Sequence, residues 1–174
     1  LKRMIVGGFE KVYELGRIFR NEGISTKHNP EFTSVEIYQA FSNYEDMMNI
    51  TEDLICHILS SICKSHIINY QSHKIDFSPH WQKLTMKEAV LKFTGINFDE
   101  FKGDLNQAIS VLEENKFVIP KQINSLGRLL NEVFEQKVES KLIQPTFITD
   151  YPIEISPLAR RHSNDKDMVQ RFEL

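Results

Sequence analysis

The sequence lacks several features that would restrict its class. No apolar run reaches about 18 residues, the length that a membrane-spanning helix needs, so we expect no membrane span. Repeats and low-complexity tracts are absent, and cysteine is scarce. Cys56 and Cys63 fall in one predicted helix at a separation of roughly 10 Å, which is too long for an unstrained disulfide. We therefore predict that both are small buried hydrophobes in a reducing compartment.

The chain also lacks a strong charge of one sign. Its 21 Lys and Arg against 24 Asp and Glu give a net charge of −3, which leaves no electrostatic footprint for nucleic acid. Five histidines outside the motif described next show no spacing typical of a metal site. They are His57, His66, His73, His80 and His162. We predict no metal ligands within this chain. Its 174 residues, 41% apolar, match one ordinary globular domain with a core.

The most informative segment is 19–41, FRNEGISTKHNPEFTSVEIYQAF. Residues 12–20 and 34–41 carry the β-branched and aromatic side chains that favour strands. Residues 21–31 between them contain Gly, Ser, Asn and Pro, which favour turns. The pattern predicts two strands joined by a polar loop.

Alternation along the second predicted strand places Glu36 and Tyr38 on the same face. Their Cα atoms are expected roughly 6.5–7 Å apart, so a carboxylate and a phenol can hold one ammonium group between them. Arg20, at the end of the first strand, is a candidate phosphate ligand. From spacing alone, solvent exposure or an ion pair with Glu22 is the favoured interpretation of Arg20. An outward position on a half-exposed strand is the alternative for Glu36, and Tyr38 on the same face argues against it.

The remaining pattern predicts an α+β fold with an antiparallel sheet and a helical insertion. Long helices are expected at 44–65 and 123–138. Two shorter helices are expected between them, one from the Thr85-x-x-Glu88 capping box to Gly95 and one from Asp104-x-x-Gln107 to near Asn115. A short hairpin is expected at 67–70 and 74–77, and a strand at 145–151. We divide the chain into a core part, 1–78, a helical insertion, 79–141, and a second core part, 142–174.

The motif FRNEGIS, followed by HNPEFT and E-x-Y, resembles motif 2 of the class II aminoacyl-tRNA synthetases, in the version found in bacterial lysyl-tRNA synthetases. Residues 142–160, LIQPTFITDYPIEISPLAR, and 171–174, RFEL, resemble the sequence ahead of motif 3 in the same enzymes. The resemblance covers almost the whole chain and is weaker over 80–116. It implies the class II catalytic fold.

The resemblance also implies roles for individual residues. Arg20 matches the catalytic arginine that grips the reacting phosphate, and Glu36 and Tyr38 match residues that bind lysine. The ATP-binding set that it implies is Arg20, Glu22, His28, Asn29 and Phe32, with Phe32 stacking on adenine. Lys27 either approaches the pyrophosphate or lies in solvent.

The implied activity is ATP-dependent activation of L-lysine to lysyl-adenylate and its transfer to tRNA(Lys). The implied protein is a cytoplasmic homodimer that uses Mg²⁺. By this resemblance the chain is an inactive piece of a catalytic domain: motif 1 is expected before Leu1, and the magnesium ligands and motif 3 arginine beyond Leu174.

Two other functions stay open. One is a shortened paralogue that attaches a lysine-type group to elongation factor P; the length of residues 80–141 and the SPLA block argue against it. The other is a non-catalytic tRNA-binding or interaction module. Such a module has no need to keep Arg20, Glu22, Glu36 and Tyr38 together.

Overall fold

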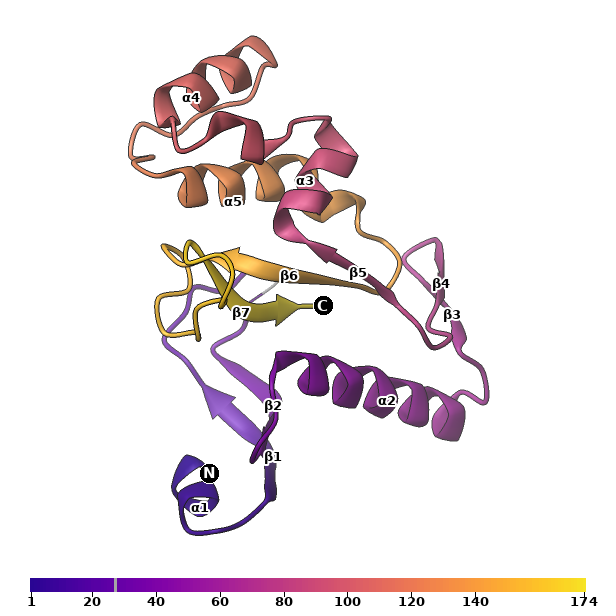
Figure 1. The fold of residues 1–174 in the computed structure, drawn as a ribbon. Helices are drawn as coiled ribbons and strands as arrows, with labels where there is room; N and C mark the ends of the chain where they lie inside the picture. The colour runs from indigo at the N-terminus through magenta and orange to yellow at the C-terminus, as the bar shows by residue number, and fades with distance from the viewer. Residues whose placement is uncertain (27) are drawn as a thin grey trace. The chain divides into compact units, whose positions relative to one another are not determined.

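The computed structural model describes residues 1–26 and 28–174. The chain divides into two compact units, Leu1–Asn43 and Tyr44–Leu174. Figure 1 shows the elements of both units along the chain. None of the helices among the described residues has the length and apolarity that a membrane crossing requires.

The first unit is a β-hairpin preceded by a short helix. The helix is α1 (Lys2–Val6), and the strands β1 (Lys11–Phe19) and β2 (Glu31–Gln39) pair antiparallel. The pairing runs without a shift from Lys11 opposite Gln39 to Phe19 opposite Glu31. The two strands and the intervening loop are therefore confirmed.

The bounds of these strands differ from the prediction by a few residues. β2 begins at Glu31 because residues 31–33 pair with residues 17–19 of β1, a partner that local turn preference does not reveal. β2 ends before Phe41, whose left-handed backbone (φ 58°) cannot continue a strand. As a result, Phe32 lies in β2, and Arg20 is the first residue after β1.

The second unit is built on a mixed three-stranded sheet in the order β5-β6-β7. Its strands are β5 (Gln82–Thr85), β6 (Thr146–Pro152) and β7 (Met168–Glu173). The prediction of an antiparallel sheet is wrong for one pair, because β5 runs parallel to β6. The chain between these two strands is a long helical crossover, which is the kind of connection that parallel strands require. A separate hairpin, β3 (Ile67–Tyr70) with β4 (His73–Asp76), is confirmed.

Helices cover both faces of this sheet. Figure 1 shows α3, α4 and α5 on one side of β5–β7 and α2 on the other. The helices of the second unit are α2 (Tyr44–Ile62), α3 (Met86–Thr94), α4 (Leu105–Glu114) and α5 (Leu126–Lys137), with short 3₁₀ helices η1 (Phe98–Phe101) and η2 (Glu139–Lys141). Adjacent residues of β6 face opposite cores. Phe147 packs with Met48, Cys56 and Trp81 on the α2 side, and Ile148 joins the larger core under α3–α5.

A β-bulge in β6 changes this alternation at Asp150. The register shifts between Thr149 and Tyr151, and Asp150 has a left-handed backbone with φ 57°. Without the bulge, Asp150 would share the face of Ile148. Instead Tyr151 joins Ile148 in the larger core, and the Asp150 carboxylate meets Tyr44 at the start of α2. The bulge therefore keeps a charged side chain out of that core.

Side-chain caps define the ends of several helices as predicted. Thr85 accepts from the Glu88 backbone N–H while the Glu88 side chain accepts from the Thr85 backbone, a complete capping box. Gly95 ends α3 in the left-handed conformation, with φ 77°. Asp104 caps α4 by accepting from the Gln107 backbone N–H. These local contacts confirm the two predicted helix starts.

Two helix ends differ from the prediction. α2 stops at Ile62 instead of 65, so Cys63 lies beyond it and is exposed, whereas Cys56 is buried as expected. α5 begins only after Ser125, whose side chain accepts from the Arg128 backbone N–H. Ile123 belongs to the apolar pattern but packs on the core from outside the helix. An apolar period alone does not locate the cap.

The proposed division at 79 and 141 stays a prediction. β5 lies inside the segment 79–141 and pairs with β6. Helices α3 and α5 share one core with Ile148 of β6 and Val169 of β7. The segment therefore contributes both a strand and a helical layer to the sheet of the second unit.

Gly127, the second residue of α5, is expected to tolerate no side chain. A Cβ there would lie 2.7 Å from the Cβ of fully buried Pro152 and would also meet the Glu154 carboxylate. Gly→Ala in an open helix stabilises by roughly 0.5–1 kcal/mol. For Gly127→Ala we expect the reverse, a loss of about 1–3 kcal/mol from overpacking, measured by urea unfolding.

Gly16→Ala is the control, because no atom outside its neighbours lies within 4 Å of a Cβ built at Gly16. We expect this variant to keep the wild-type unfolding midpoint or exceed it. An unchanged or higher midpoint for Gly127→Ala would contradict the packing argument.

Candidate active site

The loop end of the β1–β2 hairpin encloses a pocket of about 410 Å³. All five residues predicted to bind ATP line it, together with two that the sequence argument did not single out. The lining residues are Arg20, Glu22, Ser25, Thr26, His28, Asn29 and Phe32. Ser25 and Thr26 lie inside the predicted polar loop. Their position between Gly23 and Asn29 is the sequence feature that could have identified them as pocket residues.

The hairpin register explains why Arg20 and Phe32 meet. Ile18 and Phe32 are directly opposite, so their side chains share a face, and Arg20 follows Ile18 on that face. The Arg20 backbone N–H donates to the Pro30 carbonyl at 2.9 Å, which closes the loop. The Arg20 guanidinium carbon lies 5.3 Å from the centroid of the Phe32 ring. The strand pairing thus places a cation beside an aromatic face.

Arg20 also contacts Glu22, as one alternative expected. Their nearest nitrogen and oxygen are 4.0 Å apart, and the Arg20 side chain is 64% exposed. Glu22 is half-buried, but an ion pair this long with an exposed arginine contributes little free energy. The contact is therefore compatible with Arg20 turning to an anionic ligand.

His28 is held by a local turn within the loop. Its backbone N–H donates to the Ser25 hydroxyl at 3.0 Å, and the Ser25 backbone N–H donates to the His28 carbonyl at 2.9 Å. The Ser25 hydroxyl also lies 3.2 Å from Nδ1 of the His28 ring. These contacts fix the ring at the pocket edge. Lys27 lies outside the described residues, so its predicted approach to pyrophosphate stays a prediction.

Glu36 and Tyr38 lie on the same face of β2 and are in contact. The Tyr38 hydroxyl donates to Oε2 of Glu36 at 3.1 Å. This hydrogen bond, with burial and the charge of Glu36, raises the pKa of Tyr38 above its ordinary value. The ammonium of Lys2 lies 5.9 Å from the centroid of the Tyr38 ring. The predicted pairing of a carboxylate and a phenol on one face is confirmed, whereas its ligand stays a prediction.

One family profile matches the whole chain, residues 1–174. Its description is "tRNA synthetases class II (D, K and N)". The chain belongs to this family. The resemblance drawn from the FRNEGIS and HNPEFT motifs is therefore confirmed.

Curated relatives of this class II synthetase chain carry the name "Lysine--tRNA ligase". They include proteins of Prochlorococcus marinus subsp. pastoris (strain CCMP1986 / NIES-2087 / MED4), 71% identical, and of Prochlorococcus marinus (strain MIT 9515), 72% identical. A third, from Synechococcus sp. (strain RCC307), is 57% identical. Each match covers 100% of this chain and 34% of the relative. The chain thus spans about a third of the length of these relatives.

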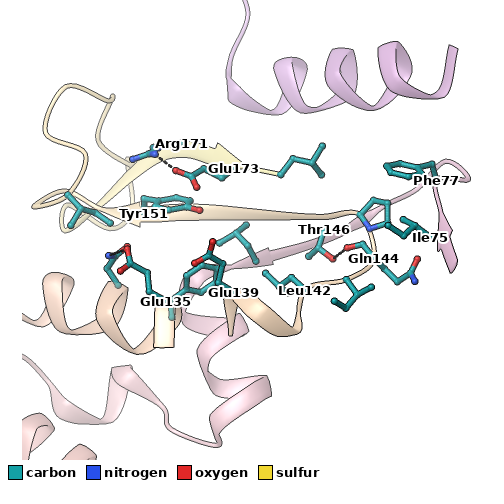
Figure 2. Close-up of a pocket in the computed structure, with 17 residues that line it drawn as sticks. Ile75, Phe77, Glu135, Glu139, Leu142, Gln144, Thr146, Tyr151, Arg171 and Glu173 are labelled. Carbon is teal, nitrogen blue, oxygen red and sulfur yellow. Dashed lines mark hydrogen bonds and ion pairs between the residues drawn. The ribbon is translucent and has the colours of Figure 1, made fainter. Parts of the chain in front are cut away.

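A second cleft, of about 630 Å³, lies in the unit Tyr44–Leu174 of this synthetase chain. In Figure 2, Glu135 and Glu139 lie on its helical side and Tyr151 on its sheet side. The Arg171 guanidinium stacks 4.7 Å from the Tyr151 ring centroid and pairs with Glu173. Among the described lining residues Arg171 is the one Lys or Arg, and it is already engaged. The loop pocket is therefore the better candidate for a triphosphate.

Asp150, Tyr44 and His162 form a polar cluster that the sequence argument did not identify. The Tyr44 hydroxyl donates to Oδ1 of Asp150 at 3.3 Å, and Nε2 of His162 lies 3.6 Å from the same oxygen. Burial raises the pKa of Asp150, and the charges of Glu88 and Asp165 act in the same direction, while His162 and Tyr44 oppose the shift. The three residues come from separate elements, so no local pattern connects them.

Asp150→Asn is expected to change the pH dependence of stability. Because folding raises the pKa of Asp150 above 3.8, its contribution to stability is fully present below pH 3.8 and is lost as pH rises through the folded pKa. Asparagine does not titrate and tolerates a positive φ. As the pH rises from 3.8 toward neutral, the free energy of unfolding of the variant should therefore increase relative to that of the wild type.

Urea unfolding midpoints across that range test this expectation. Asp53→Asn, on the exposed side of α2, is the matched control and should follow the wild type. The same pH slope for Asp150→Asn and the wild type would show that Asp150 does not titrate with a raised pKa.

Proposed function

We propose that the protein containing this chain activates L-lysine with ATP and transfers the lysyl group to tRNA(Lys). The observation that carries the proposal is one face of the β1–β2 hairpin. Arg20 and Phe32 meet at its loop end, and the Glu36–Tyr38 pair lies further along β2 on the same face. Glu36 lies four positions after Phe32 along the strand, roughly 13 Å away, which suits a nucleotide joined to an amino acid. The name of the relatives supports the same substrates.

In the first step, an oxygen of the lysine carboxylate bonds to the α-phosphorus of ATP, and pyrophosphate leaves. Negative charge builds on the reacting phosphate, so a fixed cation beside it lowers the barrier. We assign this role to Arg20, because its planar fork can hold phosphate and carboxylate oxygens together. The weak contact to Glu22 yields to the stronger attraction of phosphate.

The loop pocket is proposed to hold the nucleotide. Phe32 offers a ring face on which adenine can stack, an interaction that requires no hydrogen bonds to the edges of the base. Glu22, His28 and Asn29 line the same pocket and are proposed to contact adenine and the distal phosphates. The Ser25–His28 turn keeps this wall in place before ATP binds.

The lysine side chain is proposed to end at Glu36 and Tyr38. A desolvated ammonium is unfavourable unless a carboxylate balances it, so a lysine-selective site requires acidic residues. An amino acid without the ammonium leaves these acceptors unpaired, which produces discrimination.

In the second step, a terminal ribose hydroxyl of the tRNA attacks the lysyl carbonyl carbon, and AMP leaves. We propose that the protein acts as a cytoplasmic homodimer, as the family resemblance implies. Because this chain has a net charge of −3, it does not attract the negatively charged tRNA backbone, and we propose that the main tRNA-binding surface lies in other parts of the protein.

Magnesium is also implied by the resemblance. Among the described residues, no group of three or more His, Cys, Asp and Glu side chains is arranged to hold a metal ion. The described residues therefore do not fit such a site, and we infer that any magnesium ligands lie elsewhere in the protein.

ATP–pyrophosphate exchange with the full-length protein, run against a panel of amino acids, tests the function. We expect exchange with lysine and little with the others. Charging of tRNA(Lys) with labelled lysine tests the second step.

Two outcomes would redirect the proposal. Exchange with lysine followed by transfer to elongation factor P, and not to tRNA, would indicate the paralogue. Absence of exchange with every amino acid, from a folded protein, would favour the non-catalytic module.

A further inference from the structure

A second carboxylate lies opposite Glu36 in the hairpin. Glu14 of β1 and Glu36 of β2 are direct partners in the antiparallel register. The side chains of such partners project from the same face, with Cβ atoms about 4.5–5.5 Å apart. Glu14 therefore shares the face of Glu36, Tyr38 and Phe32, although no motif had singled it out.

This arrangement is unfavourable for the hairpin alone. Like charges directly opposite one another destabilise an antiparallel pair. Both glutamates are exposed, and in the described part of the chain no Lys or Arg forms an ion pair with either of them. A cation placed between Glu14 and Glu36 would remove the repulsion.

The same face already accommodates an alkylammonium. The Lys2 ammonium lies 5.9 Å from the centroid of the Tyr38 ring, within the range of a cation–π contact. The hydroxyl of that ring bonds to Glu36 at 3.1 Å. An ammonium next to Tyr38 is therefore compatible with the local geometry.

We propose that Glu14 is a specificity-determining residue that binds the side-chain ammonium of the substrate lysine together with Glu36. The inference rests on the proposed function. An ammonium has three N–H donors, and the two carboxylates with the Tyr38 oxygen supply three acceptors. Glu36 alone balances the charge, and Glu14 completes the set that an uncharged side chain leaves unpaired.

The test measures pyrophosphate exchange by the full-length protein with Glu14→Gln. We expect the KM for lysine to rise about tenfold or more, as for the loss of a charged hydrogen-bond partner, while the KM for ATP stays near the wild-type value. Norleucine has a side chain that ends in a methyl group, so its KM should not change in the variant. The ratio of the KM values for norleucine and lysine should therefore shrink. Glu10→Gln, an exposed glutamate just before β1, is the matched control and should resemble the wild type.

Unfolding without lysine provides a second readout. Because Glu14→Gln removes a repulsion, its urea midpoint should equal or exceed that of the wild type; a failure to fold would overturn the inference. Equal losses for lysine and ATP, or behaviour like Glu10→Gln, would overturn it as well.

Glu14→Asp, which keeps the charge, should retain lysine discrimination better than Glu14→Gln. If the wild-type protein shows no lysine-dependent exchange, the proposed function is contradicted, and so is the role of Glu14 that rests on it.

Discussion

Arg20→Ala in the full-length protein is expected to lower lysine-dependent pyrophosphate exchange by about two to three orders of magnitude. The physical reason is the loss of a preorganised cation at the reacting phosphate, worth about 3–4 kcal/mol in comparable sites. Arg20 lies at the loop end of β1 and lines the pocket with Phe32. Its side chain is 64% exposed, so the folded state should lose little stability.

Arg17→Ala is the matched control for this experiment. Arg17 lies in β1, three residues before Arg20 and on the opposite face, where it pairs with Glu31 at 3.6 Å and is 76% exposed. We expect Arg17→Ala to keep near-wild-type exchange. Comparable activity of the two variants would show that Arg20 does not act on the phosphate.

Glu36→Gln is expected to weaken lysine binding by roughly 2–5 kcal/mol while ATP binding changes little. Glutamine keeps the shape of Glu36 and can still accept from the Tyr38 hydroxyl, but it cannot balance an ammonium. Titration calorimetry with each substrate separately measures the two effects.

Glu31→Gln is the control on the same strand, because Glu31 faces the other side of the hairpin and pairs with Arg17. It should bind lysine as the wild type does. Equal losses of lysine and ATP affinity in Glu36→Gln would mean that Glu36 supports the hairpin and does not bind substrate.

Much of the hairpin and its candidate site was predictable because both depend on short-range rules. Alternation placed Glu36 and Tyr38 on one face, and their side chains are in contact. The resemblance of the loop to motif 2 supplied the residues proposed to bind ATP, and these residues line one pocket. Glu14 was missed because its place opposite Glu36 depends on the register between two strands.

The helices follow the same division. The capping box of Thr85 and Glu88 and the glycine at 95 specify α3 through contacts within a few residues, so its ends were predictable. By contrast, β5 has four residues, too few for a periodic signal, and exists through pairing with β6 far along the chain. That pairing also makes the sheet mixed.

The sequence by itself determined the family, the hairpin with its polar loop and the helix caps, and it supplied the residues that we propose to bind ATP and lysine. Each depends on neighbouring residues or on a contiguous motif. Only the tertiary structure decided the parallel β5–β6 pair and the bulge that turns Asp150 toward Tyr44 and His162. These features depend on contacts between segments distant in sequence, whose partners no local pattern specifies.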